Sequence, residues 1–181
     1  MERYRITPES SVYYVTFTIV DWLPVFVAEA PCRIVTDSLN YCHREKGLRI
    51  NAFVIMPTHL HAIVFDAEFQ AERLNRTLTD FRKFTGRRLA DYCGEHAPRS
   101  FQDVLRESAG SDRERRFWQP SRHPEAIYTE PFWRTKLDYL HENPCRKGFV
   151  TRAAWWRFSS AAYYVSDAQQ PSEVVISPIL W

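Results

Sequence analysis

The chain has 181 residues, of which 45% are hydrophobic and 25% are charged. This composition is typical of a globular protein of about one domain, with enough apolar material for a buried core. The formal net charge of +2 is too small to indicate a nucleic-acid partner by itself. Only five glycines occur and no glycine-rich phosphate loop is found, so we expect no bound nucleotide cofactor.

The N-terminal residues contain no apolar segment that could act as a secretion signal, and the longest hydrophobic stretches are too short to cross a membrane. The cysteines are widely spaced and form no C-x-x-C pair; they are Cys32, Cys42, Cys93 and Cys145. This pattern favours free thiols in a reducing compartment over a disulfide or metal framework. We therefore expect a cytoplasmic protein that does not contact a membrane.

Segments dense in β-branched and aromatic residues predict strands at 12–19, 49–56, 59–65 and 125–128. Pro57-Thr58 separates the second strand from the third and predicts a hairpin. Apolar residues at helical spacing predict helices at 31–46, at 71–92 and from a Thr129 cap to about Asn143.

Residues 93–116 are dominated by Gly, Pro, Ser and charged residues. We interpret them as a loop, or a short helix of low stability, outside the core. Strands and helices interleave but include a hairpin, so the sequence predicts a single α+β domain over residues 1–165. Residues 166–181 then form a C-terminal tail.

His59 and His61 lie two residues apart within an apolar predicted strand. Residues at this spacing point to the same face of a strand, about 7 Å apart. Two imidazoles placed in this way can converge on one divalent cation. The alternative is a pair of half-exposed histidines on an edge strand, and the H-x-H pattern alone does not decide between the two.

Tyr139 and Asn143 are four residues apart in the last predicted helix, so their side chains share one face. The amide oxygen of Asn143 could ligate a hard metal ion. The phenol of Tyr139 is a poor nucleophile unless it is activated. By themselves, the two residues are better explained as a half-buried aromatic and a helix C-cap before proline.

Basic residues gather in two segments, 76–92 and 134–152, each of which holds five Lys or Arg against two acidic residues. The first segment includes Arg82, Lys83 and Arg87, and aromatic residues are interleaved with the charges in both. Phosphate attraction combined with ring stacking is what single-stranded nucleic acid requires, although solvated helix faces have a similar pattern.

Several of these segments, taken in order, are similar to one known family. M-P-T-H-L-H-A-I-V at 56–64 resembles the M-P-N-H-x-H segment of the HUH single-strand transposases. W-Q at 118–119 and D-Y-L-H-E-N-P-C-R-K-G-F-V at 138–150 resemble the REP-associated tyrosine transposases, a branch that acts on repetitive extragenic palindromes. Further matching strings lie at 13–18, 81–85 and 156–160, so the resemblance covers about residues 3–164.

The resemblance implies a ferredoxin-like sheet with the histidines on a central strand and the tyrosine on a helix laid across it. It implies that Tyr139 is the nucleophile, and that His59, His61 and Asn143 hold Mg²⁺ or Mn²⁺. Thr58 departs from the family pattern, in which Asn or Glu is usual at this place.

The activity implied is cleavage and rejoining of single-stranded DNA hairpins through a 5′-phosphotyrosine. We expect Arg82, Lys83 and Arg87 to hold the DNA backbone, and an N-terminal arm with Arg3 and Arg5 to touch bases or a hairpin stem. One active site per chain permits a monomer or a homodimer.

Three other functions fit parts of the sequence. A replication initiator or relaxase uses similar chemistry on differently placed motifs. A binding protein for single-stranded nucleic acid could keep the basic segments without catalysis. A metal-dependent hydrolase would use water in place of Tyr139 and leave no covalent adduct.

Overall fold

The computed structural model describes residues 6–8, 10–111, 114–120 and 124–179. The strands are β1 (Val12–Thr18), β2 (Leu48–Met56), β3 (His59–Asp66) and β4 (Glu125–Ile127). The α-helices are α1 (Glu29–Glu45), α2 (Ala71–His96), α3 (Arg99–Glu107), α4 (Glu130–Arg146) and α5 (Ala161–Val165). Two 3₁₀ turns, η1 and η2, lie at Val20–Trp22 and Ala153–Trp155.

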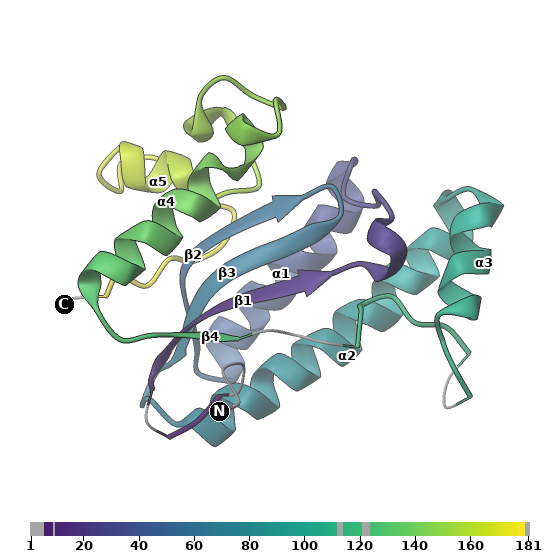
Figure 1. Cartoon of the computed structure of the whole chain (residues 1–181), viewed down its shortest axis with the longest axis horizontal. Coiled ribbons are helices and arrows are strands. Elements are labelled where there is room, and N and C mark those ends of the chain that lie inside the picture. The colour runs from purple at the N-terminus through teal and green to yellow at the C-terminus, as the bar shows by residue number, and fades with distance from the viewer. Residues whose placement is uncertain (1–5, 9, 112–113, 121–123, 180–181) are drawn as a thin grey trace.

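The four strands form one sheet in the order β2-β3-β1-β4, and every neighbouring pair is antiparallel. With α1 between β1 and β2 and α2 between β3 and β4, this is the ferredoxin-like arrangement (Figure 1). β2 and β3 form the predicted hairpin, which turns at Pro57-Thr58. The predicted α+β class is confirmed, and β3 is an inner strand.

Helices cover both faces of the sheet. α1 and α2 lie on one face, where they enclose the larger apolar cluster, and α4 lies across the other (Figure 1). Thr129 caps α4 as predicted, because its side chain accepts a hydrogen bond from the amide of Phe132. The apolar residues that recur at helical spacing in α2 are buried in the core; they are Leu74, Leu78, Phe81 and Leu89.

Of the two alternatives predicted for segment 93–116, the structure has the short helix, but this helix packs on the core and does not lie outside it. α2 continues to His96, and α3 follows it after two residues. The side chains of Cys93 and Leu105 are fully buried in the main cluster. The polar composition of the segment concealed a few apolar residues at helical spacing, and these are sufficient to pack α3 against the rest of the fold.

The C-terminal tail continues the fold along β2. The amide of Ser177 donates to the carbonyl of Ile50, and Ile176 forms a parallel bridge with the same residue. Glu173 pairs with Arg33 on α1 at 2.7 Å and with Arg157 at 2.8 Å. The tail is therefore attached to β2 and α1 by both backbone and side-chain contacts.

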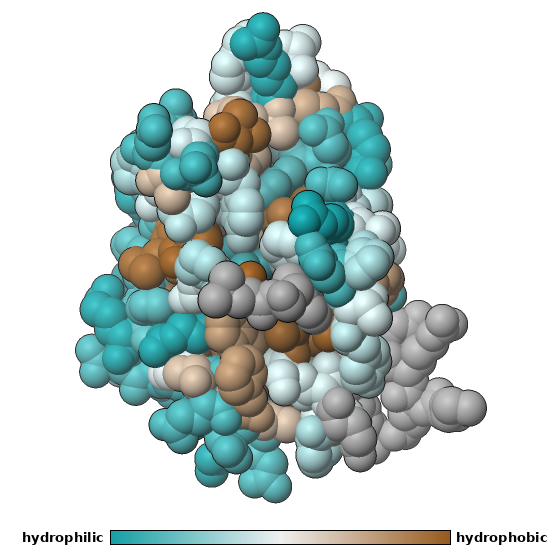
Figure 2. Space-filling view, turned by 90° about the vertical axis from the view of Figure 1, so that its left-hand side faces the viewer, coloured by the Kyte–Doolittle hydropathy of each residue, from teal (hydrophilic) through white to brown (hydrophobic). Residues whose placement is uncertain are grey.

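Hydrophilic residues cover most of the face shown in Figure 2, and hydrophobic ones form separate patches between them. Within the described ranges, none of the helices is both long enough and apolar enough to span a bilayer.

Candidate functional site

The two histidines of the H-x-H segment lie side by side on β3. Their ring centroids are 4.5 Å apart, at an interplanar angle of 68°. β3 is flanked by β1 and β2, so the alternative of an edge strand is wrong. Both rings face α4 because the intervening Leu60 points into the cluster under α1 and α2.

Each imidazole is held by a threonine hydroxyl. Thr16, directly opposite His61 on β1, places its Oγ1 2.7 Å from His61 Nδ1. Thr58 Oγ1 lies 2.9 Å from Nδ1 of His59. When Nδ1 donates to such an oxygen, the lone pair on Nε2 is left available for a metal ion. The departure at Thr58 therefore provides a hydrogen-bond partner for the adjacent histidine.

Burial keeps both imidazoles neutral at physiological pH. Loss of hydration, with a smaller contribution from the charge of Lys147, lowers the pKa of His59 to about 4. Loss of hydration and the neighbouring His59 lower the pKa of His61 to about 3. A neutral imidazole is the form that ligates a metal.

Tyr139 on α4 lies over this pair of histidines. Its ring centroid is 6.1 Å from that of His61 and 6.4 Å from that of Tyr14 on β1. The side chain is 46% exposed, so its hydroxyl can be reached from solvent. The guanidinium of Arg146 lies 4.1 Å from the Tyr139 ring centroid, which fixes the ring from its other side.

Asn143 is one turn beyond Tyr139 on the same helix and is almost completely buried. It does not cap α4, as the alternative interpretation required, because the helix continues to Arg146 and Lys147 is the C-cap. Its backbone carbonyl accepts from the amide of Lys147. The amide side chain of Asn143 therefore lies on the same face of α4 as Tyr139.

Tyr14 is a site residue that sequence reasoning missed. Its ring lies 5.2 Å from that of His61, and its buried hydroxyl has no hydrogen-bond partner in the described part of the chain. Burial raises the pKa of Tyr14, so it remains a neutral donor. The alternation of side chains along β1 predicts that Tyr14 faces the same side of the sheet as Thr16. Only the register between β1 and β3 places it beside His61.

Lys136, one turn before Tyr139, contributes a positive charge to the same face. Its ammonium lies 4.9 Å from the centre of the Tyr14 ring and pairs with Glu125 of β4. His141, two residues after Tyr139 on α4, points away from the histidine pair. Its Nε2 is 2.8 Å from the hydroxyl of Ser160.

The donor types fit a hard divalent cation only if the asparagine takes part. In the described ranges, no group of three or more His, Cys, Asp or Glu side chains could hold a metal. Two neutral imidazoles and one amide oxygen form a mixed set suited to Mn²⁺ or Mg²⁺ completed by oxygens of a substrate or water. The unpartnered Tyr14 hydroxyl beside this set is consistent with an oxygen-rich ligand.

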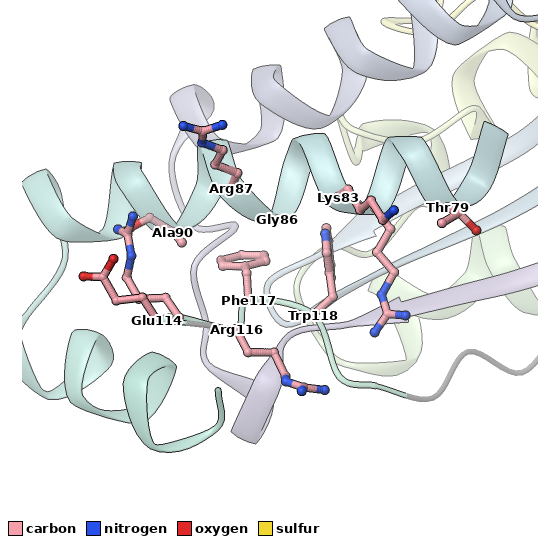
Figure 3. A pocket seen from close by; sticks show the side chains of 11 residues that line it. Thr79, Lys83, Gly86, Arg87, Ala90, Glu114, Arg116, Phe117 and Trp118 are labelled. Atoms are coloured by element: carbon pink, nitrogen blue, oxygen red, sulfur yellow. The ribbon is translucent and has the colours of Figure 1, made fainter. Parts of the chain in front are cut away.

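The predicted basic contacts lie on the other side of the sheet. Arg82, Lys83 and Arg87 line a pocket of about 600 Å³ between α2 and the segment 114–118. Figure 3 shows the Phe117 and Trp118 rings beneath α2, whereas Arg87 extends from the other side of the helix. Arg82 donates to the carbonyl of Gln119. The three cations therefore do not converge on one point.

Because Gly86 has no side chain, α2 can approach Trp118 closely at this pocket. A Cβ at this position would lie 3.2 Å from Cδ1 of Trp118, whose Nε1 donates to Thr85 at 3.0 Å. The predicted arm residues Arg3 and Arg5 lie outside the described residues.

Comparison with known proteins agrees with the sequence motifs. No protein-family profile matches the chain. A REP-associated tyrosine transposase of Escherichia coli K12 is 26% identical over 117 residues, which is 65% of this chain and 56% of that protein. The chain thus matches little more than half of this relative.

A solved structure, of a REP-associated tyrosine transposase bound to a REP hairpin, superposes with a TM-score of 0.62. Its sequence identity is 18%, and the match covers all of this chain and 93% of the other. The predicted resemblance to the REP-associated tyrosine transposases is confirmed. The chain and that structure share one fold, a four-stranded antiparallel sheet with helices packed on it.

Proposed function

We propose that the protein cleaves and rejoins single-stranded DNA at hairpin sequences, with Tyr139 as the nucleophile. One observation carries this proposal: a half-exposed tyrosine lies over a pair of neutral, oriented imidazoles on an inner strand. A merely structural aromatic gains nothing from two buried histidines fixed by threonines beneath it. The relative that binds a REP hairpin supports hairpin DNA as the substrate.

In this proposal, His59, His61 and Asn143 hold Mg²⁺ or Mn²⁺. A cation held there would offset the negative charge on a phosphate oxygen and so lower the barrier to displacement at phosphorus. Thr16 and Thr58 keep the two imidazoles in the ligating orientation. Such supporting hydrogen bonds are commonly needed for full affinity at metal sites.

The oxygen of Tyr139 attacks the scissile phosphorus, and the bond to the 3′ oxygen breaks as the bond to tyrosine forms. The phenol gives up one proton and the leaving 3′ oxygen takes up one, so the step is balanced. The products are a 5′-phosphotyrosine and a strand that ends in a 3′-hydroxyl. Another 3′-hydroxyl reverses the step, because the covalent link retains the phosphodiester energy. Arg146 orients the Tyr139 ring, and Tyr14 donates a hydrogen bond to a phosphate oxygen.

The hairpin backbone contacts the basic pocket beside α2, through Arg82, Lys83 and Arg87. These contacts fix the register of the DNA but do not select its sequence. Because the pocket and Tyr139 lie on different sides of the sheet, a strand that contacts both passes around one edge of the sheet. The proposed arm residues Arg3 and Arg5 precede β1, which adjoins β4.

The test is a denaturing gel with a labelled single-stranded hairpin oligonucleotide, run with Mn²⁺ or Mg²⁺. We expect a protein–DNA band that survives denaturation in the wild type and is absent in both Tyr139→Phe and His59→Ala. Binding of the hairpin by both variants shows that they fold. His96→Ala, which removes an exposed histidine at the end of α2, is a matched control and should retain the band.

The other outcomes identify the alternatives. A protein that binds hairpins but forms no adduct with any of them is a binding protein. Cleavage that persists in Tyr139→Phe identifies a hydrolase that uses water. An adduct with origin-like sequences and none with palindromes identifies a replication initiator or relaxase.

A further inference from the structure

Residues 147–155, the segment that follows α4, expose aromatic rings beside positively charged side chains. Trp155 is 61% exposed and Phe149 is 49% exposed, although both belong to a segment that contacts the core. The guanidinium of Arg152 lies 5.1 Å from the Trp155 ring centroid. We call Phe149, Arg152 and Trp155 the aromatic platform. In Figure 1 this segment lies at the top of the view, beyond the end of α4.

The Phe149 ring of the platform is held in place although it is half exposed. Phe149 stacks on Trp156 at 5.5 Å with an interplanar angle of 27°, and Nε1 of Trp156 donates to the Ile55 carbonyl of β2 at 2.8 Å. The amide of Phe149 donates to the carbonyl of Pro144 in α4. Fixed, solvent-facing rings lose little entropy when a flat ligand stacks on them.

The platform adjoins the proposed active site. Pro144, to which Phe149 is hydrogen-bonded, follows Asn143 directly in α4. Ile55, the anchor of Trp156, is paired with Leu60, which lies between the two histidines on β3. Lys147, next to Gly148 at the start of the segment, is close enough to His59 for its charge to act on that imidazole. The start of this segment is therefore close to the histidines.

We propose that the aromatic platform binds the unpaired bases next to the scissile phosphate, with Trp155 and Phe149 as stacking surfaces. Arg152 and Lys147 contact the phosphates between those bases. Exposed rings interleaved with cations are complementary to single-stranded DNA, whose every nucleotide offers a flat base and a negative charge. A duplex stem offers only its backbone, since its bases are already stacked. The inference rests on the function proposed above and gives the site a reason to act on unpaired DNA.

The experiment compares two probes that differ only in their bases. Both carry the same hairpin stem and an unpaired extension of about six nucleotides. In one probe the extension contains thymidine, and in the other it contains abasic residues with the same phosphates. Affinities are measured by fluorescence anisotropy, with all variants made in a Tyr139→Phe background so that no DNA is cleaved.

We expect the parent protein to bind the thymidine probe about tenfold more tightly than the abasic probe, since each stacked base adds substantially to affinity. Trp155→Ala should remove most of this difference, whereas Trp155→Phe should keep most of it. Tyr41→Ala is the matched control: Tyr41 is half exposed on α1, across the sheet, and its loss should change neither affinity. Arg152→Gln should weaken binding of both probes and reduce the salt dependence by about one phosphate contact.

An unchanged preference for thymidine in Trp155→Ala would overturn the platform, provided that its thermal unfolding matches that of the parent. Equal binding of both probes by the parent would overturn it as well. Phe149→Ala offers the same test should Trp155→Ala fail to fold. In each of these outcomes the parent still binds the hairpin stem, so the proposed function stands. Failure of the parent to bind either probe would instead defeat the proposed function.

Discussion

The two faces of the sheet are built from the same strands but differ in chemistry. On the face under α1 and α2, alternate residues of β1 and β3 are apolar and almost completely buried, as Phe17 and Leu60 are. On the face under α4, the intervening residues include the polar side chains Thr16, His59 and His61. The same strand therefore stabilises the fold through one set of residues and carries the candidate site on the other.

The face under α4 also carries an apolar cluster. It includes Ile63 of β3 and Leu140 of α4, and it attaches α4 to the sheet. Val54 and Met56 of β2, which belong to the same cluster, are the cross-strand partners of His61 and His59. These apolar contacts hold α4 on the sheet, while about half of Tyr139 remains exposed.

The strongest contrast between the faces concerns stability. Leu60→Ala should lower the free energy of unfolding by about 2–5 kcal/mol, because it leaves a cavity beneath a fully buried side chain. His61→Ala, one residue away, should cost less and abolish adduct formation. Urea denaturation of the two variants measures the difference. Equal losses of stability would show that the two faces are not specialised in this way.

A second prediction concerns how stability depends on pH, and it is tested at His141 on α4. Burial lowers the pKa of His141 to about 4, below the 6.5 of the unfolded chain. The unfolded state therefore binds more protons, and this histidine's contribution to stability is lost as the pH falls from 6.5 toward 4. His59 and His61 act with the same sign.

His141→Gln, which can still bond Ser160 but does not titrate, should flatten the dependence of stability on pH by up to about 1.4 kcal/mol per unit over that range. Urea midpoints at several pH values between 4 and 7 provide the measurement. A slope identical to that of the wild type would mean that His141 does not remain neutral in the folded protein.

The orientation of His61 offers a third test. Thr16→Val removes the hydroxyl that holds Nδ1 and keeps the shape of the side chain. We expect Mn²⁺ affinity to fall by about 10- to 100-fold while the thermal midpoint changes little. Calorimetric titration with Mn²⁺ measures the affinity. Val15, the preceding residue, is buried on the face under α1 and α2. Val15→Ala should therefore lower the free energy of unfolding and leave the affinity for Mn²⁺ unchanged.

We expect the smallest effect on stability from changes on the outer surface of α1 and α2, away from both faces of the sheet. Lys46 and Asp80 form an exposed ion pair there, with a side-chain exposure of 32% and 52%. Asp80→Asn should change the free energy of unfolding by less than about 1 kcal/mol, and by less still at high salt. A large loss in thermal denaturation would contradict this.

Local patterns were sufficient to predict most elements and the two halves of the candidate site. The period of two in strand 59–65 placed both histidines on one face, and the helical spacing paired Tyr139 with Asn143. Neither pattern states that the two halves meet. That juxtaposition was implied by the resemblance to a family, and the structure places Tyr139 beside His61.

Features that depend on register and on long-range contacts were missed. Thr16 and Tyr14 join the site because β1 pairs with β3 in one particular register, which no local pattern encodes. α3 was expected to be a loop or a weak helix, since its attachment to the core rests largely on Leu105. The basic residues of α2 were predicted as one group, but their side chains diverge around the helix.

The C-terminal segment also limits how the sheet can associate with other chains. β2 is an edge strand of nine residues, and an open edge of this length is a template for pairing between molecules. Here Ile176 bridges it near one end, and Ser159 bridges it near the other. β4, at the opposite edge, has only three residues. By occupying the one long edge, the segments after α4 protect the chain against edge-to-edge aggregation.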